Sequence, residues 1–566
     1  MREFEQRSAM PGAGVVRVRM FGVAVLPLLM GLLFFAASLT PSLIPRPWLL
    51  QGVLAGLVTG IGYAIGQFLN TVWRGLDLPT LSAPAVRKMC VILAIPIIAI
   101  LVWTLLHAAA WQNSIRVRFG MEPLEAFSTM GIVGVATAVF LVCVAIGWAA
   151  QWLFDRIRHS LYRVMPMRTA NVLGLCLAIL IGFVITRDGV VQSGYDFADK
   201  SYAAAQNLFA DAPPAPTNPR FPGSPDSLVD WGAMGQPGRN FIIEGPDAQA
   251  ISAFSGRPAK DPIRVYVGRA QDESPEVRAE LALKELQRLG AFDRKILVVA
   301  SPTGTGWLDP GGHEPMEFMH DGDVATVAVQ YSYLQSPLAL IFETQSGLEQ
   351  ATATMKAIYS YWTTLPPETR PKFYMHGISL GAWSSMYSFN VFRVLNDPIN
   401  GALWTGPPFP SQLWRQAVAA RNPDSSYVLP EVGTGALVRF TSQYGGLERS
   451  PGQWGRFRVV YFQHASDAIV FYEPASLWRA PEWMKETRAP DVSPSIRFIP
   501  VVTQLQLALD MALALGVPGG YGHNYIAEGY VEPWVAVTDP EGWSDNDSAR
   551  LKAWCGQEWG LGCRRE

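Results

Sequence analysis

One short stretch of the 566-residue chain combines a reactive side chain with residues that would expose it. It reads Lys372-Phe-Tyr-Met-His-Gly-Ile-Ser-Leu-Gly381 and contains the pattern Gly377-x-Ser379-x-Gly381. At a sharp turn from a strand into a helix, a serine between two glycines presents its hydroxyl as a nucleophile, because the glycines remove side chains that would collide. An apolar run ends at the motif, and a helix-compatible run over 382–395 follows it. The pattern predicts Ser379 as a nucleophile; the alternative is a glycine turn with a capping serine.

A serine nucleophile needs a base to accept its proton and a carboxylate to orient that base. Where the serine stands at such a turn, the acid and then the histidine follow it along the chain. Asp467 comes just after the apolar run 458–462 and is the predicted acid. Asp491 and Asp510 are the alternatives, with Asp510 expected on the solvent face of a helix. His523, in a glycine-rich loop after Asp467, is the predicted base; the alternative is a loop histidine satisfied by local hydrogen bonds.

The oxyanion that forms when a serine attacks a carbonyl needs backbone N–H donors. We expect one donor from Leu380, directly after the nucleophile, and the other from Thr303, Gly304 or Thr305 after the apolar run 296–300. A phosphate-binding loop is the weaker interpretation of these residues, because no Gly-Lys-Ser/Thr follows them. Four further side chains are expected to line the pocket: His376, His464, Trp307 and Tyr331.

The C-terminal part of the chain alternates between two kinds of pattern. Strands are expected at 263–267, 296–300, 324–330, 372–376 and 458–462. Helices are expected at 275–289, 343–362 and after Leu380. This alternation predicts a mainly parallel sheet covered by helices on both faces. In such a sheet the active site lies beyond the carboxyl ends of the strands.

The N-terminal third of the chain contains long stretches without charge. Five segments satisfy the length and polarity needed to cross a bilayer: 21–39, 49–69, 91–111, 129–154 and 170–186. We interpret the first as a retained helix and not as a cleaved signal peptide. Glycines recur every four residues in the second segment, at Gly52, Gly56 and Gly60, which favours close helix packing. The predicted helical bundle is a packed membrane anchor.

The basic residues between these segments predict an orientation. Eleven lie on the side of the N-terminus and four on the opposite side. Because positive residues favour the cytoplasmic side, the N-terminus is expected there, at the inner (plasma) membrane of a bacterium. Five crossings would then place the chain after Arg187 outside the cytoplasm. A disulfide between Cys555 and Cys563 would suit that compartment; the alternative is two free thiols.

The domain boundaries follow from these patterns. We expect a transmembrane domain at 1–187, a proline-rich connector at 188–235 and a catalytic domain at 236–566. The net charge of −2 and the absence of a basic patch exclude nucleic acid as an expected partner. Five cysteines without a Cys-x-x-Cys pair predict no zinc site, and we predict no other metal and no cofactor.

The chain resembles a family of bacterial membrane-anchored α/β-hydrolases, which join a multi-span N-terminal domain to a hydrolase domain. The resemblance rests on these stretches: Ser38-Leu-Thr-Pro-Ser-Leu-Ile-Pro-Arg-Pro47, Thr303-Gly-Thr-Gly-Trp307, Gln330-Tyr-Ser-Tyr333, Gly377-x-Ser-Leu-Gly381, Trp404-Thr-Gly-Pro-Pro408, Gln463-His-Ala-Ser-Asp467, Pro500-Val-Val-Thr503 and Gly522-His-x-Tyr525. It implies the α/β-hydrolase fold and a Ser379–Asp467–His523 triad. Ala468 departs from the proline that relatives often have, and a helix-like run over 503–515 precedes His523.

These inferences lead to one expected function and two alternatives. The expected function is that of a membrane-anchored serine hydrolase of the esterase or lipase type, acting through an acyl-enzyme on lipid or acylated envelope substrates. A bilayer tether raises the effective concentration of such substrates. The alternatives are an acyltransferase with the same triad and a non-catalytic envelope scaffold. The expected partners are the lipid bilayer and a small-molecule or lipid ester.

Overall fold

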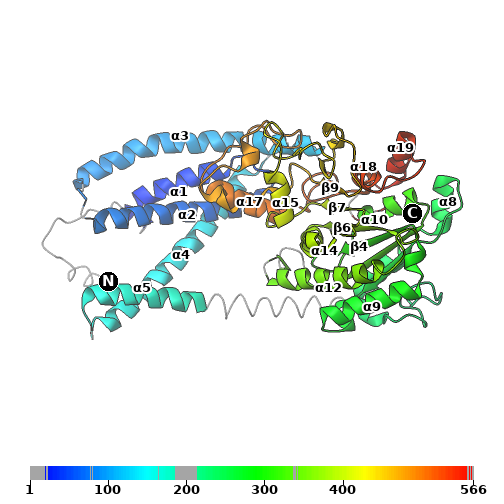
Figure 1. Ribbon diagram of the computed structural model, residues 1–566. Coiled ribbons are helices and arrows are strands. Elements are labelled where there is room, and N and C mark those ends of the chain that lie inside the picture. The colour runs from blue at the N-terminus through cyan, green and yellow to red at the C-terminus, as the bar shows by residue number, and fades with distance from the viewer. Residues whose placement is uncertain are drawn as a thin grey trace. The chain divides into compact units, whose positions relative to one another are not determined.

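The computed structural model describes residues 19–20, 23–76, 78–79, 81–125, 127–163, 165–184, 213–334, 339–340, 342–394, 396–556, 560 and 562–563. The chain forms two compact units, which we call the helical unit and the sheet unit (Figure 1). The helical unit comprises Met1–Phe183, Pro474–Ala480 and Val492–Asp510, and the sheet unit comprises the rest. Two stretches of the expected catalytic domain therefore belong to the helical unit. Of the expected connector, residues 188–212 lie outside the described residues.

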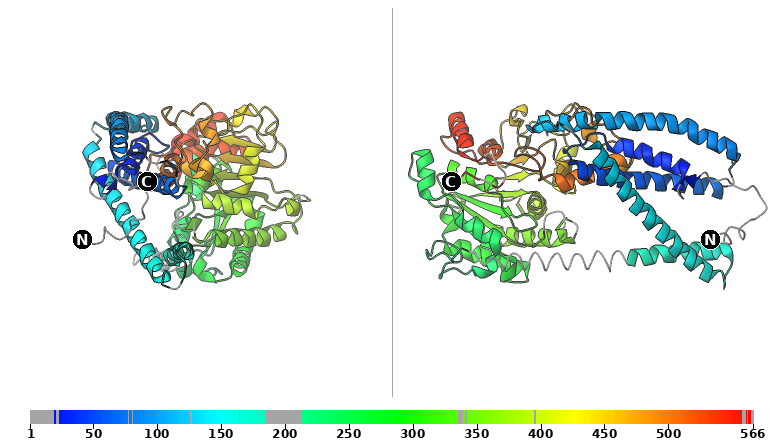
Figure 2. Two further views of the ribbon diagram at one scale, coloured as in Figure 1. Left: turned by 90° about the vertical axis from the view of Figure 1, so that its left-hand side faces the viewer. Right: turned by 180° about the vertical axis from the view of Figure 1, so that it is seen from behind.

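The helical unit has one helix at each of the five predicted segments. These are α1 (Val25–Ser38), α2 (Trp48–Gly75), α3 (Ala83–Arg116), α4 (Thr129–Leu161) and α5 (Met167–Val184), which Figure 2 shows from two further sides. In the described residues, three stretches are long and apolar enough to cross a membrane: Trp48–Trp73, Pro84–Phe119 and Thr129–Leu161. Helix α1 is apolar but has 14 residues, fewer than the roughly 20 that a span needs.

The glycines of α2 allow its neighbours to approach closely, as the sequence predicts. A Cβ atom on Gly56 would lie 2.7 Å from the carbonyl oxygen of Ala136 and 2.6 Å from Cβ of Val139, both in α4. A Cβ atom on Gly62 would lie 2.7 Å from the ring of Phe34 in α1. Any larger residue at these positions would push the helices apart. Small residues at such contacts let backbones pack closely where lipid offers no hydrophobic driving force.

Helix α17 (Val502–Leu513) brings part of the C-terminal region into the helical unit, where Val502 packs against α2. Asp510 of α17 accepts hydrogen bonds from Ser42 Oγ and from Leu43 N, both at 2.8 Å. The prediction that Asp510 lies on a solvent face is therefore wrong, since its side chain is fully buried. Burial raises the pKa of Asp510 to about 6. These bonds give Asp510 a role in joining α17 to the segment after α1.

The sheet unit is built on seven parallel strands. They are β3 (Ile263–Val267), β4 (Ile296–Ser301), β5 (Val324–Val329), β6 (Lys372–Ile378), β7 (Gly401–Thr405), β8 (Val438–Thr441) and β9 (Arg458–Phe462). Their order across the sheet is β3-β5-β4-β6-β7-β9-β8, and every neighbouring pair is parallel. The mainly parallel sheet and all five predicted strands are confirmed, while β7 and β8 are additional. The strand that leads to Ser379, β6, lies in the middle of the sheet.

Helices cover both faces of this sheet (Figure 1). Phe373 of β6 contacts Trp362 of α12 (Thr344–Trp362), with ring centroids 5.5 Å apart. His376, three residues further along β6, points to the opposite face because side chains alternate along a strand. Its ring contacts Trp534 of α18 (Ala527–Thr538), with centroids 5.4 Å apart. Helix α9 (Pro275–Arg288) packs beside α12, and α10 (Pro310–Met319) packs beside α18. The predicted two-sided cover is confirmed.

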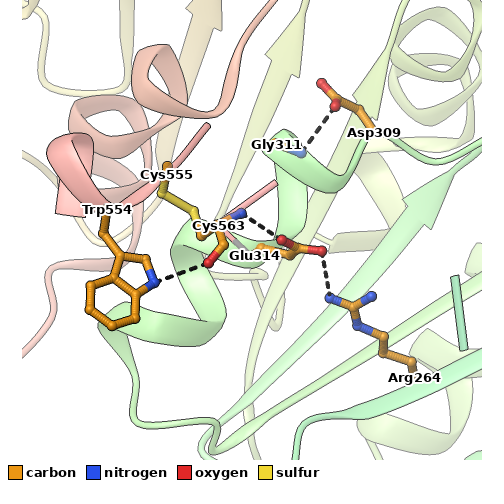
Figure 3. The surroundings of a disulfide bond; sticks show 7 residues. All are labelled: Arg264, Asp309, Gly311, Glu314, Trp554, Cys555 and Cys563. Carbon is orange, nitrogen blue, oxygen red and sulfur yellow. Dashed lines mark hydrogen bonds and ion pairs between the residues drawn. A yellow bond between two sulfur atoms is a disulfide. The ribbon is translucent and has the colours of Figure 1, made fainter. Parts of the chain in front are cut away.

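The predicted disulfide between Cys555 and Cys563 is present, after α19 (Asp545–Trp554). Figure 3 shows Cys563 beside α10, where Glu314 Oε2 accepts a hydrogen bond of 2.6 Å from Cys563 N. On the other side, Trp554 Nε1 donates to the carbonyl oxygen of Cys563 at 3.0 Å. The disulfide thus joins the end of α19 to Cys563, which lies at a buried carboxylate of the sheet unit.

Candidate active site

Ser379 occupies the single-residue turn between β6 and α13 (Leu380–Ser388). Its backbone has φ 56° and ψ −128°, a conformation that residues other than glycine rarely adopt. Two hydrogen bonds hold the turn: Ser379 N donates to Thr405 O at 3.0 Å, and Trp383 N donates to Ser379 O at 3.2 Å. Strain of this kind persists only where the surrounding structure enforces it, and it concentrates at functional sites. The backbone thus has the strained strand-to-helix geometry expected of a serine nucleophile, and Ser379 itself is buried.

The two flanking glycines are required by close backbone contacts. A Cβ atom on Gly377 would lie 2.4 Å from both the carbonyl carbon and the oxygen of Gly381. A Cβ atom on Gly381 would lie 2.1 Å from the carbonyl oxygen of Ser301, the last residue of β4. The start of α13 is therefore pressed against its own strand and against the end of the neighbouring strand. The residues after β4, which are the predicted oxyanion loop, begin at that second contact.

Asp467 and His523 are directly hydrogen-bonded. His523 Nδ1 lies 2.7 Å from Asp467 Oδ2, and both side chains are buried. Asp467 begins the short helix α16 (Ala468–Phe471), and its Oδ1 accepts from Ile469 N at 2.9 Å. An ionised carboxylate only accepts, so His523 carries its proton on Nδ1 and its Nε2 has a free lone pair. Nε2 is buried and has no partner among the described residues.

The end of β7 brings Ser379 and His523 to the same part of the sheet. Thr405, the last residue of β7, accepts the hydrogen bond from Ser379 N. At the next residue, Gly406, an added Cβ atom would lie 2.7 Å from Cε1 of His523. Within the described part of the chain, no hydrogen bond joins Ser379 Oγ to His523 Nε2. Bonds between catalytic groups are often long before substrate binds and shorten in the complex.

The two alternative acids have other partners. Asp491 is buried and accepts hydrogen bonds from Ser466 N at 3.0 Å and from Gln443 Nε2 at 3.2 Å. Asp510 accepts its hydrogen bonds from Ser42 and Leu43 in the helical unit. Of the three carboxylates, Asp467 is the one that contacts the His523 ring.

The predicted oxyanion loop is a tight turn held by two residues that sequence reasoning did not single out for this purpose. Tyr266 Oη donates to Gly306 O at 2.8 Å, and Gln330 Nε2 donates to Thr305 O at 3.1 Å. Thr303 N donates to Trp307 O at 3.0 Å within the turn, so the prediction of Thr303 as an oxyanion donor does not fit this conformation. The N–H groups of Gly304 and Leu380 have no acceptor among the described residues.

Residues 263–551 match the family model described as the alpha/beta-hydrolase family, and residues 39–246 match the model of that family's N-terminus. The first match alone covers more than half of the chain. The chain belongs to the alpha/beta-hydrolase family. No curated protein and no solved structure matches it. Membership supports a hydrolase-type function and gives no substrate.

In this alpha/beta-hydrolase the four predicted pocket residues have different surroundings. His376 is packed between the sheet and α18, and burial lowers its pKa to about 4. Tyr331 is buried against Gly347, and Trp307 is partly exposed in the oxyanion loop. His464 lies at the Asp467–His523 pair, where its Nδ1 donates to Gly522 O at 3.0 Å. His464 is therefore the predicted pocket residue with a direct link to the loop of the predicted base.

The Asp467–His523 pair also has a third partner, which the sequence analysis did not single out. Tyr525 Oη lies 2.8 Å from Asp467 Oδ2, the same oxygen that His523 contacts. The sequence signal is the spacing Gly522-His-x-Tyr525, which places a phenol two residues after the predicted base. Among the described residues, no group of three or more His, Cys, Asp or Glu is arranged to hold a metal ion.

Proposed function

We propose that this chain is a membrane-anchored serine hydrolase that cleaves carboxylic esters through an acyl-enzyme. Ser379 is the nucleophile, His523 the base and Asp467 the residue that orients the base. The observation that carries the proposal is the strained conformation of Ser379, at φ 56°, between a central strand and a helix. The hydrogen-bonded Asp467–His523 pair supports it, because a serine alcohol needs an acceptor for its proton.

The proposed reaction has two halves. Ser379 Oγ attacks the ester carbonyl carbon while its proton passes to His523 Nε2. The N–H groups of Leu380 and Gly304 donate to the oxyanion, which collapses as the proton passes from Nε2 to the leaving alcohol. Water then attacks the acyl-enzyme with the same proton transfers, which releases the acid and restores Ser379. Asp467 stabilises the imidazolium that exists during each half.

The surroundings of Ser379 favour a substrate with an apolar acyl group. Leu334, Ala339 and Leu380 form a buried cluster, against which Leu340 and Trp383 pack. Leu380 is the residue directly after the nucleophile. Because three helices are apolar enough to span a bilayer, we propose a lipid or acylated envelope component as the substrate class.

Covalent labelling tests the nucleophile. A fluorophosphonate probe is expected to label the full-length native chain in detergent and to leave Ser379→Ala unlabelled, with peptide mapping as the measurement. Ser384→Ala is the matched control, because Ser384 is buried in the same helix and its Oγ donates to Leu380 O at 2.9 Å. Labelling of Ser379→Ala at the native level would identify another nucleophile, and an unlabelled native chain would favour the scaffold. Product analysis with glycerol as acceptor distinguishes hydrolysis from acyl transfer.

We further propose that the sheet unit lies outside the cytoplasm. The eleven-to-four distribution of basic residues supports this orientation, and so does the Cys555–Cys563 disulfide, which suits an oxidising compartment. This orientation requires all five helices to cross the bilayer, including the short α1. Helix α5 must then cross last, because α4 returns the chain to the basic side. Alkaline phosphatase fused after residue 165 is expected to be inactive, and the same reporter fused after residue 215 is expected to be active. Equal activity of the two fusions would show that α5 does not cross.

A further inference from the structure

The carboxylate of Asp467 accepts three hydrogen bonds, and only one of them comes from the proposed base. Its Oδ1 accepts from Ile469 N at 2.9 Å. Its Oδ2 accepts from His523 Nδ1 at 2.7 Å and from Tyr525 Oη at 2.8 Å. Donors on both oxygens restrict the rotation of the carboxylate. The phenol and the imidazole therefore share one oxygen whose position determines where the imidazole ring points.

Tyr525 is suited to act as a permanent donor. Its side chain is fully buried, and its ring stacks on the His464 ring with centroids 4.1 Å apart. Burial, followed by the charge of Asp467, raises the pKa of Tyr525 well above its ordinary value. The phenol therefore keeps its proton near neutral pH. Because an ionised carboxylate has no proton to give, the hydrogen bond runs from Tyr525 to Asp467.

Residues His464–Asp467, which we call the Asp467 turn, hold the backbone just before His523. Ser466 Oγ accepts from Gly522 N at 2.9 Å, and His464 Nδ1 donates to Gly522 O at 3.0 Å. Burial lowers the pKa of His464 to about 4, so it is a neutral donor near pH 7. His523 N donates to Ala514 O at 3.0 Å. The base is thus held at its backbone as well as at its ring.

We propose that Tyr525 is a positioning residue for the Asp467–His523 pair, because its hydroxyl holds Asp467 Oδ2 toward His523 Nδ1 while the Asp467 turn fixes Gly522. This inference rests on the proposed function. The competing explanation is that Tyr525 only fills the core through its ring contacts with His464 and Phe462. Tyr525 Oη also accepts from His464 N at 3.3 Å. A phenylalanine would keep the ring contacts and lose both hydrogen bonds of the hydroxyl, so it separates a role of the hydroxyl from one of the ring alone.

The test is ester hydrolysis by Tyr525→Phe in the full-length chain. We expect kcat to fall about 10- to 100-fold, the change that corresponds to losing one hydrogen bond to a charged group. KM should stay within about two-fold of the native value, because Tyr525 acts on the base and not on the substrate. The rate of fluorophosphonate labelling should fall by the same factor as kcat, because labelling uses the same proton acceptor.

Tyr530→Phe is the matched control. Tyr530 is also fully buried, its Oη donates to Asp309 Oδ2 at 2.8 Å, and its ring contacts Phe462. The Tyr530→Phe variant therefore also loses a buried phenol hydrogen bond, but to a carboxyl group that does not touch His523. We expect a decrease in thermal midpoint similar to that of Tyr525→Phe, with kcat within about two-fold of native.

Two results would overturn the positioning role: a kcat for Tyr525→Phe within two-fold of native, or an equal loss of kcat in both tyrosine variants. If Tyr525→Phe does not fold, Ser466→Ala serves instead, because it removes the acceptor for Gly522 N. An unchanged kcat in Ser466→Ala would then overturn the part of the proposal in which the Asp467 turn fixes Gly522 and so positions the base. A native chain that neither hydrolyses esters nor reacts with the probe would refute the proposed function itself, and this is measured without any variant.

Discussion

The Asp467→Asn variant is expected to hydrolyse esters with a kcat about 10⁴-fold lower than the native chain, at nearly unchanged KM. An asparagine has one accepting oxygen and one donating NH₂ group, whereas all three partners of Asp467 are donors. If the oxygen faces Ile469 N, the NH₂ group faces His523 and Tyr525. His523 then accepts at Nδ1 and carries its proton on Nε2, where it cannot take the proton of Ser379. If the amide is flipped, the NH₂ group faces the Ile469 N–H and the turn is destabilised.

The matched control for this variant is Asp309→Asn. Asp309 is buried, begins α10, and accepts from Tyr530 Oη and from Gly311 N. Burial raises the pKa of Asp309 to about 7, so near neutral pH it is partly protonated and an amide is a close substitute. We expect its kcat to remain within about two-fold of native. The measurement is kcat on a p-nitrophenyl ester for both variants, and a kcat for Asp467→Asn within ten-fold of native would remove Asp467 from the catalytic role.

The strands that the sequence predicts well have five or more residues, and most of their side chains are apolar. β3 and β9 have the predicted bounds, because all or nearly all of their residues are buried and apolar positions run through them. The sequence does not predict β7, a short strand that begins with a glycine, or β8, a four-residue strand at the edge of the sheet that contains Arg439. Both strands form because neighbouring strands of the sheet pair with them. A short stretch of sequence does not show which distant strands will be its neighbours.

The same limit applies to the candidate site. The sequence points to Asp467 because this residue follows an expected strand. It points to His523 because this is the one histidine after Asp467 in the chain. The burial of Asp510 was not predictable, because its partner Ser42 lies 468 residues away in the sequence. The hydrogen bond from Tyr525 to Asp467 spans 58 residues, so the sequence shows the phenol beside the base but not the oxygen that it reaches. Tertiary contacts of this kind decide which polar residues act together.

The Gly381→Ala variant is expected to lower the free energy of unfolding of the sheet unit by about 3 kcal/mol. The added Cβ atom would lie 2.1 Å from Ser301 O and 3.0 Å from Pro302 O. Both obstacles are backbone atoms, which cannot turn aside as the end of a flexible side chain can. Relief therefore requires α13 to move away from the end of β4, which separates Leu380 N from the oxyanion loop. Hydrolysis should fall together with stability.

Thermal unfolding followed by tryptophan fluorescence measures this effect, with Gly516→Ala as the control in the same unit. An added Cβ atom on Gly516 would meet Leu513 O at 3.4 Å, an ordinary contact, so its midpoint should change little. For a unit of this size, about 3 kcal/mol corresponds to a midpoint lower by roughly 4 °C. A midpoint for Gly381→Ala equal to that of the control would mean that α13 can shift at little cost. The strained turn at Ser379 would then not depend on the contact between Gly381 and Ser301, and another element would have to enforce it.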